Sequence, residues 1–257
     1  MKNRISYYLS NITERVNPED VDLSSFEIKK SLNPKIWDNN GLLKPEVRKH
    51  LIKIAQDFLG FLDIPWVDYT DVIFTGSLAN YNWSNYSDID LHILINRGDI
   101  NDNLELVDEY LSAKKKLWSN EHKIKIYGFD VECYAQDINE EHASSGVYSI
   151  LNNKWLIIPS KDKPQLDKTL IKRKASSIMS KIDNIVILNS EGKYEEVLKE
   201  YKLLWDKIKK MRQSGLDRVG EFSYENIVFK ILRRTEYIEK LTTTKLDAYD
   251  KLNSIKQ

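Results

Sequence analysis

Residues 74–92 read FTGSLANYNWSNYSDIDLH, and this stretch decides which fold the sequence predicts. Its first residues end an apolar run and lead into Gly76-Ser77. Ten residues separate Ser77 from Asp88, and Asp88 and Asp90 open a second apolar run. Because side chains alternate between the two faces of a strand, we expect Asp88 and Asp90 to project from the same face.

A pair of aspartates at this spacing favours a metal site. Two carboxylates a few ångströms apart repel each other unless a cation lies between them. Oxygen ligands suit Mg²⁺ or Mn²⁺ and the chemistry of phosphates. An Asp-x-Asp or a Gly-Ser alone is commonly a solvated turn, but the two together, each beside an apolar strand, favour a catalytic site.

A third acid is expected on a later strand. Asp130 and Glu132 share one face of the run that follows the turn at residues 127–129. Glu132 lies between Val131 and Cys133, where an unpaired carboxylate in mid-strand would be costly. We therefore favour Glu132 over Asp130, which lies next to the turn.

The remaining pattern predicts an α/β (α+β) fold, with a small mixed sheet flanked by helices and a helical C-terminal region. The expected strands are 72–75, 88–95, 123–126 and 131–135, and the expected helices are 45–59, 102–119, 166–188, 192–213 and 223–241. The predicted domains are residues 1–160, with an N-terminal helical extension, and residues 161–257.

Composition bounds the function. The chain has 257 residues and a single cysteine, Cys133, which excludes an intrachain disulfide and fits a reducing compartment. Cys133 lies in an apolar run and is expected to be a packed thiol. No apolar stretch reaches the roughly 18–20 residues that span a bilayer. We expect a cytoplasmic protein with no membrane partner.

The charge is divided unevenly along the chain. Residues 1–160 hold 17 Lys+Arg against 24 Asp+Glu, a net of −7. Residues 161–257 hold 22 against 15, a net of +7. This division suits a polyanionic substrate, although a solvated, lysine-rich helical surface explains it too.

The motif residues resemble the nucleotidyltransferase superfamily, whose best-known member is DNA polymerase beta. The motif of that family begins with an apolar residue followed by Gly-Ser or Gly-Gly. After a gap of about nine to thirteen residues it continues with Asp-x-Asp or Asp-x-Glu, and a third acid follows on a later strand. Here the match is Gly76-Ser77, Asp88, Asp90 and Glu132 (or Asp130), within residues 70–136. Residues 33–37 and 146–149 also look like uncharacterised nucleotidyltransferase-like proteins encoded by bacteriophages.

The resemblance implies roles for these residues. Asp88, Asp90 and Glu132 would hold two Mg²⁺ (or Mn²⁺) ions, and Glu132 would hold one ion, accept the hydroxyl proton, or do both. Gly76 and Ser77 would bind the phosphates of ATP or another NTP. The reaction would move NMP to a hydroxyl acceptor: an RNA or tRNA end, a nucleotide, a protein or a small molecule. The alternative is a catalytically inactive fold that binds a protein or nucleic acid.

The sequence departs from several relatives, which carry an arginine soon after Gly-Ser. None occurs here before Arg97. The candidates for meeting the triphosphate charge lie in the basic half of the chain, and each is also a plausible surface arginine: Arg212, Arg218, Arg233 and Arg234. Other residues have two interpretations each: His92 is a neighbour of the metal site or an ordinary strand histidine, and Tyr81, Tyr148 and Trp155 stack a base or fill the core.

Overall fold

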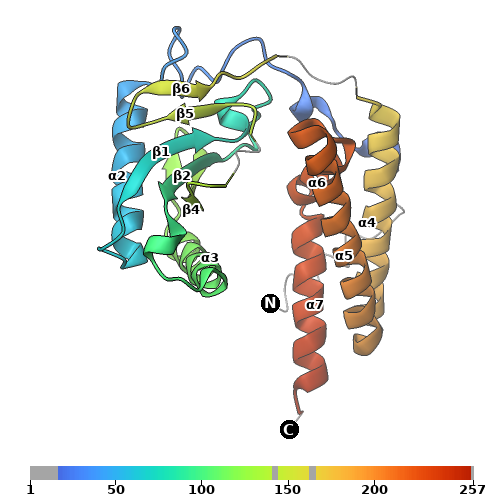
Figure 1. Cartoon of the computed structure of the whole chain (residues 1–257). Helices are drawn as coiled ribbons and strands as arrows, with labels where there is room; N and C mark the ends of the chain where they lie inside the picture. The colour runs from blue at the N-terminus through green and yellow to red at the C-terminus, as the bar shows by residue number, and fades with distance from the viewer. Residues whose placement is uncertain (1–16, 141–143, 162–165, 256–257) are drawn as a thin grey trace. The chain divides into compact units, whose positions relative to one another are not determined.

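The computed structural model describes residues 17–140, 144–161 and 166–255 (Figure 1). Backbone contacts divide the chain into two compact units. One, residues 24–162, contains the sheet, and we call it the sheet unit. The other, which we call the helical unit, combines residues 1–23 with residues 163–257.

The sheet unit holds a six-stranded mixed sheet with the order β3-β4-β2-β1-β5-β6. Its strands are β1 (Tyr69–Thr75), β2 (Ile89–Ile95), β3 (Lys125–Ile126), β4 (Phe129–Asp137), β5 (Val147–Ser149) and β6 (Lys154–Ile157), and its helices are α2 (Pro45–Leu62) and α3 (Leu104–Glu121). Short 3-10 turns are η2 (Ser24–Phe26), η3 (Ser77–Ala79) and η4 (Arg97–Asp99). Strands β2 and β4 are parallel, and the other neighbouring pairs are antiparallel.

One face of the sheet forms the core of this unit. Side chains in β2 alternate between buried and half-buried, as expected for a strand with one covered face. The buried set, which includes Phe74, Leu91 and Cys133, packs with Phe58 of α2 and Trp118 of α3. The half-buried residues of β2 therefore lie on the opposite face, and these include Asp90.

The sequence explains where α2 begins and ends. Pro45 stands at the first helical turn, where its missing N–H costs no hydrogen bond. The buried positions Val47, Leu51 and Phe58 follow helical spacing. Asp63, in the left-handed conformation, ends the helix.

The helical unit consists of α4 (Lys168–Ser190), α5 (Tyr194–Val219), α6 (Tyr224–Arg234) and α7 (Tyr237–Asn253), with the 3-10 turns η1 (Pro18–Asp20) and η5 (Gly220–Phe222). The N-terminal turn η1 contacts α4 through Lys172, whose Nζ lies 3.0 Å from Glu19 Oε2. Residues 17–23 thus group with the helices. The sequence places them in the N-terminal extension of the first predicted domain, and that division of the chain stays a prediction.

The α/β class, the small mixed sheet and the helical C-terminal region are confirmed. Two details differ from the expectation. The segment 223–241 is two helices, because Glu236 adopts a left-handed conformation with φ 62° between them. Strands β5 and β6 are absent from the prediction, since three or four residues are too few to show a period. In the described residues, no helix combines the length and apolar character needed to cross a bilayer.

A buried ion pair joins α4 to α7. Lys240 Nζ lies 2.6 Å from Asp183 Oδ1, and the two side chains are 7% and 9% exposed. Tyr237 donates its hydroxyl to the other carboxylate oxygen, at 3.2 Å. Burial raises the pKa of Tyr237, and the charge of Asp183 raises it further, so the phenol stays a donor. The Asp183 carboxylate thus depends on two α7 side chains, one for its charge and one for a further hydrogen bond.

We predict that Lys240→Ala lowers the free energy of unfolding by about 3 kcal/mol, because it leaves the Asp183 carboxylate buried without its cation. Urea denaturation followed by circular dichroism measures the loss. The matched control is Lys193→Ala, which breaks an exposed pair with Glu191 in the same unit. Equal effects of the two substitutions would show that the Lys240–Asp183 pair contributes no more than a surface pair.

Candidate active site

The Gly76 turn lies directly against Asp90. Gly76 follows β1 with a φ of 78°, a conformation that favours glycine. A Cβ built on Gly76 would stand 1.8 Å from Asp90 Oδ2. Only glycine leaves room for the carboxylate at this point, so the Gly-Ser motif and the Asp-x-Asp motif meet in space.

Strand pairing explains this contact. Thr75, the residue before the turn, pairs with Asp90 across the antiparallel β1–β2 ladder. Asp88 lies one residue before β2, and Ile89 between the two aspartates is fully buried. Asp88 and Asp90 are both half-buried, as expected for residues that share the face opposite the core.

The strand register distinguishes the positions of the two candidates for a third acid, Glu132 and Asp130. Glu132 pairs with Asp90 across the parallel β2–β4 ladder. Neighbouring strands lie about 4.8 Å apart, so paired residues project side by side from the same face. Asp130 is more exposed, and its carboxylate forms an ion pair at 2.7 Å with Lys125 on β3. The structure places Glu132, and not Asp130, beside Asp90.

The sequence argument for Glu132, that its carboxylate is buried in mid-strand, is wrong, although Glu132 does pair with Asp90. The carboxylate was expected to be costly because it would be buried in mid-strand. The Glu132 side chain is instead 46% exposed, and Lys115 Nζ on α3 lies 3.9 Å from its Oε2. At that distance and exposure the ion pair contributes little to stability.

The carboxylates are not gathered into a ready-made metal cage. Within the described ranges, no group of three or more His, Cys, Asp or Glu side chains has the arrangement of a metal site. Like charges separate when no cation lies between them. The strand register brings Asp88, Asp90 and Glu132 to the same face of the sheet, which we call the acidic face. Their carboxylate oxygens do not converge on a single metal position.

A segment outside the predicted motif supports the glycine turn. Gly76 N donates to Ser144 Oγ at 3.3 Å, and Asn80 is hydrogen-bonded to Ser145. A Cβ on Gly146 would stand 2.2 Å from the Ala79 carbonyl oxygen, so this residue also has to be glycine. The one signal for this segment in the sequence is the glycine at position 146.

Ser77 already has a partner in this structure. Its Oγ donates to Ser87 Oγ at 2.7 Å, which ties the residue after Gly76 to the residue before Asp88. The Ser87 hydroxyl also accepts from Ser84 N at 3.0 Å. These hydrogen bonds hold together the two ends of the connection between β1 and β2.

His92 and Cys133 behave as strand residues with partners. His92 Nδ1 is 2.7 Å from Gln136 Oε1, and its ring packs edge-on against Tyr134. Cys133 is 1% exposed, and burial raises its pKa to about 12. The expectation of a packed thiol is confirmed, since so high a pKa leaves no thiolate for nucleophilic chemistry near neutral pH.

The aromatic candidates divide between core and surface. Tyr148 is fully buried and packs edge-on against Trp37 and Trp155, so it cannot stack a base. Trp155 stacks on Trp37 with ring centroids 4.7 Å apart and belongs to the same cluster. Tyr81 is half-buried, and the Lys161 ammonium lies 4.8 Å from its ring centroid.

The four candidate arginines all belong to the helical unit. Arg218 forms an ion pair with Glu225 at 3.2 Å, and its side chain is 62% exposed. The Arg212 guanidinium packs on the Phe229 ring, 4.2 Å from its centroid. A role for these residues, or for Arg233 and Arg234, in meeting triphosphate charge stays a prediction.

Comparison with known proteins gives little. No protein-family model matches the chain, and no curated protein matches it. A solved structure of a STING-associated CdnE c-di-GMP synthase from Capnocytophaga granulosa aligns over 96% of this chain and 99% of that chain, with 16% identity and a TM-score of 0.21. A likeness this weak carries no argument, and the resemblance to bacteriophage proteins stays a prediction.

We predict that Gly76→Ala destabilises the chain by more than the strain of a left-handed alanine alone, because its Cβ would displace the Asp90 carboxylate. Gly128→Ala is the matched control, since Gly128 has a φ of 92° and an added Cβ would meet no atom within 4 Å. The control should cost about 1–2 kcal/mol. Thermal unfolding compares the two variants, and equal losses would contradict the close approach of Gly76 to Asp90.

Proposed function

We propose that this protein is a metal-dependent nucleotidyltransferase that moves NMP from an NTP to a hydroxyl acceptor and releases pyrophosphate. The observation that supports this most strongly is the meeting of Gly76 with Asp90, beside Glu132 on the neighbouring strand. A glycine turn without a Cβ gives phosphate oxygens access to the backbone, and carboxylates alone offer the ligands that hard divalent ions prefer.

The donor set fits Mg²⁺ or Mn²⁺. Asp88, Asp90 and Glu132 contribute oxygen atoms only, and all three are partly exposed on the acidic face. When bound, two such ions would neutralise the triphosphate and lower the pKa of the attacking hydroxyl. The carboxylates would hold these ions, and Lys115 near Glu132 would then have to move away or pair elsewhere.

The chain's own residues would position the reactants. The backbone at Gly76 and the Ser77 hydroxyl would bind the β- and γ-phosphate oxygens, which requires Ser77 to exchange its bond with Ser87 for one with phosphate. Glu132 would hold an ion, accept the proton of the attacking hydroxyl, or do both. Catalysis of this kind depends mainly on orientation and charge neutralisation.

The acceptor class stays open among an RNA or tRNA end, a nucleotide, a protein and a small molecule. The net charge of +7 in residues 161–257 favours a polyanionic acceptor, and thus RNA or a nucleotide. Incubation with each α-labelled NTP, divalent metal, cellular RNA and cellular protein separates these classes by the fraction that becomes labelled.

One observation favours the second candidate, a catalytically inactive fold that binds a partner. Lys115 Nζ lies 3.9 Å from Glu132 Oε2, and a lysine can neutralise a carboxylate without any metal. In an inactive protein, Lys115 would take the place of the ion. Binding of metal and nucleotide therefore separates the two candidates.

We predict that an NTP with Mn²⁺ raises the thermal stability of the wild-type chain and that Asp88→Asn or Asp90→Asn abolishes the effect. A ligand at 100 times its Kd adds about 2.7 kcal/mol to the free energy of unfolding. No stabilisation of the wild-type chain by any NTP with Mn²⁺ or Mg²⁺ would support the inactive fold.

The third acid has its own test. Glu132→Gln should lower the rate of pyrophosphate release by about 100-fold or more, because it removes a ligand or base at the reacting centre. Asp130→Asn, the matched control two residues away on the same strand face, should leave the rate within a few fold. The reverse order would identify Asp130 as the third acid.

A further inference from the structure

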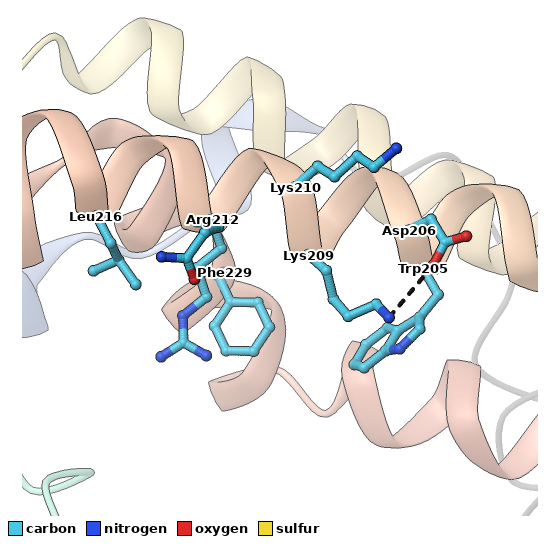
Figure 2. Close-up of a pocket in the computed structure, with 8 residues that line it drawn as sticks. Trp205, Asp206, Lys209, Lys210, Arg212, Leu216 and Phe229 are labelled. Carbon is cyan, nitrogen blue, oxygen red and sulfur yellow. Dashed lines mark ion pairs between the residues drawn. The ribbon is translucent and has the colours of Figure 1, made fainter. Parts of the chain in front are cut away.

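The helical unit contains a hollow in which aromatic and basic side chains alternate, and the proposed chemistry does not use it. Its volume is about 650 Å³, and it lies between α5 and α6 (Figure 2). The lining residues that matter here are Trp205, Lys209, Lys210, Arg212, Gln213 and Phe229. We call it the α5 hollow.

The two rings are only partly covered. Trp205 on α5 and Phe229 on α6 are both half-buried, and Figure 2 shows Lys209 between them. Tyr201, one turn before Trp205, stacks on it with an interplanar angle of 14° and so helps to fix the indole. A fixed indole with an accessible side is a surface on which a nucleobase can stack.

The charge in the hollow is mostly positive. Its lining has three cations against one carboxylate, that of Asp206, which pairs loosely with Lys209 at 3.4 Å. Within the described part of the chain, neither Lys210 nor Arg212 forms an ion pair with a carboxylate. The hollow thus offers an anionic ligand two cations that none of the described acids neutralises.

The surroundings of Arg212 are the strongest indication that the hollow binds an anion. Its Nε donates to Asn226 Oδ1 at 3.3 Å and its plane packs on the Phe229 ring, so the guanidinium is held in place by neutral groups. Burial lowers the pKa of Arg212, and the nearby charge of Arg233 lowers it further. A partly desolvated cation next to another cation is costly unless an anion compensates it.

A second hollow continues the first along α5. It has a volume of about 570 Å³, shares Lys210 and Gln213 with the first, and is also lined by Ser214, Asp217 and Arg218. Residues 205–218 extend about 20 Å along a helix axis. Two adjoining hollows of this length suit an extended chain of several nucleotides better than one compact ligand.

We propose that the α5 hollow binds single-stranded nucleic acid, with a base stacked on Trp205 and phosphates held by Lys210 and Arg212. Stacking is possible only where bases are unpaired, so a duplex should bind less well. This binding goes beyond the proposed transfer reaction and does not depend on it, because it needs neither metal nor NTP.

Fluorescence anisotropy of labelled oligouridylate and oligodeoxythymidylate, each about 20 nucleotides long, tests the proposal on the full chain without metal or NTP. Trp205→Ala should weaken binding about tenfold or more, and Trp205→Phe, which keeps a ring, should recover most of it. Lys210→Gln should reduce the slope of log K against log salt by about 0.7, because one phosphate contact is lost.

The matched control is Lys207→Gln, which removes the same charge from an exposed position of α5 that lines neither hollow. It should leave affinity and salt slope unchanged. Equal effects of Lys207→Gln and Lys210→Gln, unchanged binding by Trp205→Ala, or equally tight binding of duplex would each overturn the proposal. Full competition by uridine monophosphate at a concentration equal to that of the oligonucleotide would also overturn it, because the hollow would then bind a free nucleotide.

Discussion

The close approach of Gly76 to Asp90 is the constraint on which the rest of the candidate site depends. A Cβ at Gly76 would overlap the Asp90 carboxylate, so the residue after β1 has to be glycine. The same register places Asp90 beside Thr75 on one side and beside Glu132 on the other. A slip of one residue in either ladder would turn the acids toward the core, where burial of unpaired charge forbids them.

The two faces of the sheet differ: one packs in the core of the unit, and the other carries the acidic side chains. The face of the sheet that packs against α2 and α3 is apolar and buried, and it fixes the strands in register. The opposite face carries more polar groups, including Asp88, Asp90 and Glu132. Because the backbone is held from the apolar side, the carboxylates can stand near one another despite their repulsion.

The sequence predicts those parts of the fold and of the candidate site whose pattern lies within one segment of the chain. The strands around Asp88 and Asp90 and the helix after Pro45 follow from periodicity and end signals within one segment. The choice between Asp130 and Glu132 needs the register of β4 against β2, which is a non-local property. The sequence does not predict that Glu132 is half-exposed, for the same reason. The alternation of side chains along a strand shows which residues share a face, but not which other elements cover that face. The break at Glu236 escapes it because the apolar spacing continues across that residue.

The basic residues of α5 are another case in which the sequence pattern does not predict a contact between two elements. Their helical spacing is visible in the sequence, but Phe229, which supports Arg212, comes from a different helix. Each unit thus carries a cluster in which one sign of charge predominates, acidic on the sheet and basic on α5. A predominance of one sign of charge raises the local potential and attracts ligands of the opposite charge. Divalent ions for the acidic face and a phosphate backbone for the α5 hollow are the ligands that we propose for these two clusters.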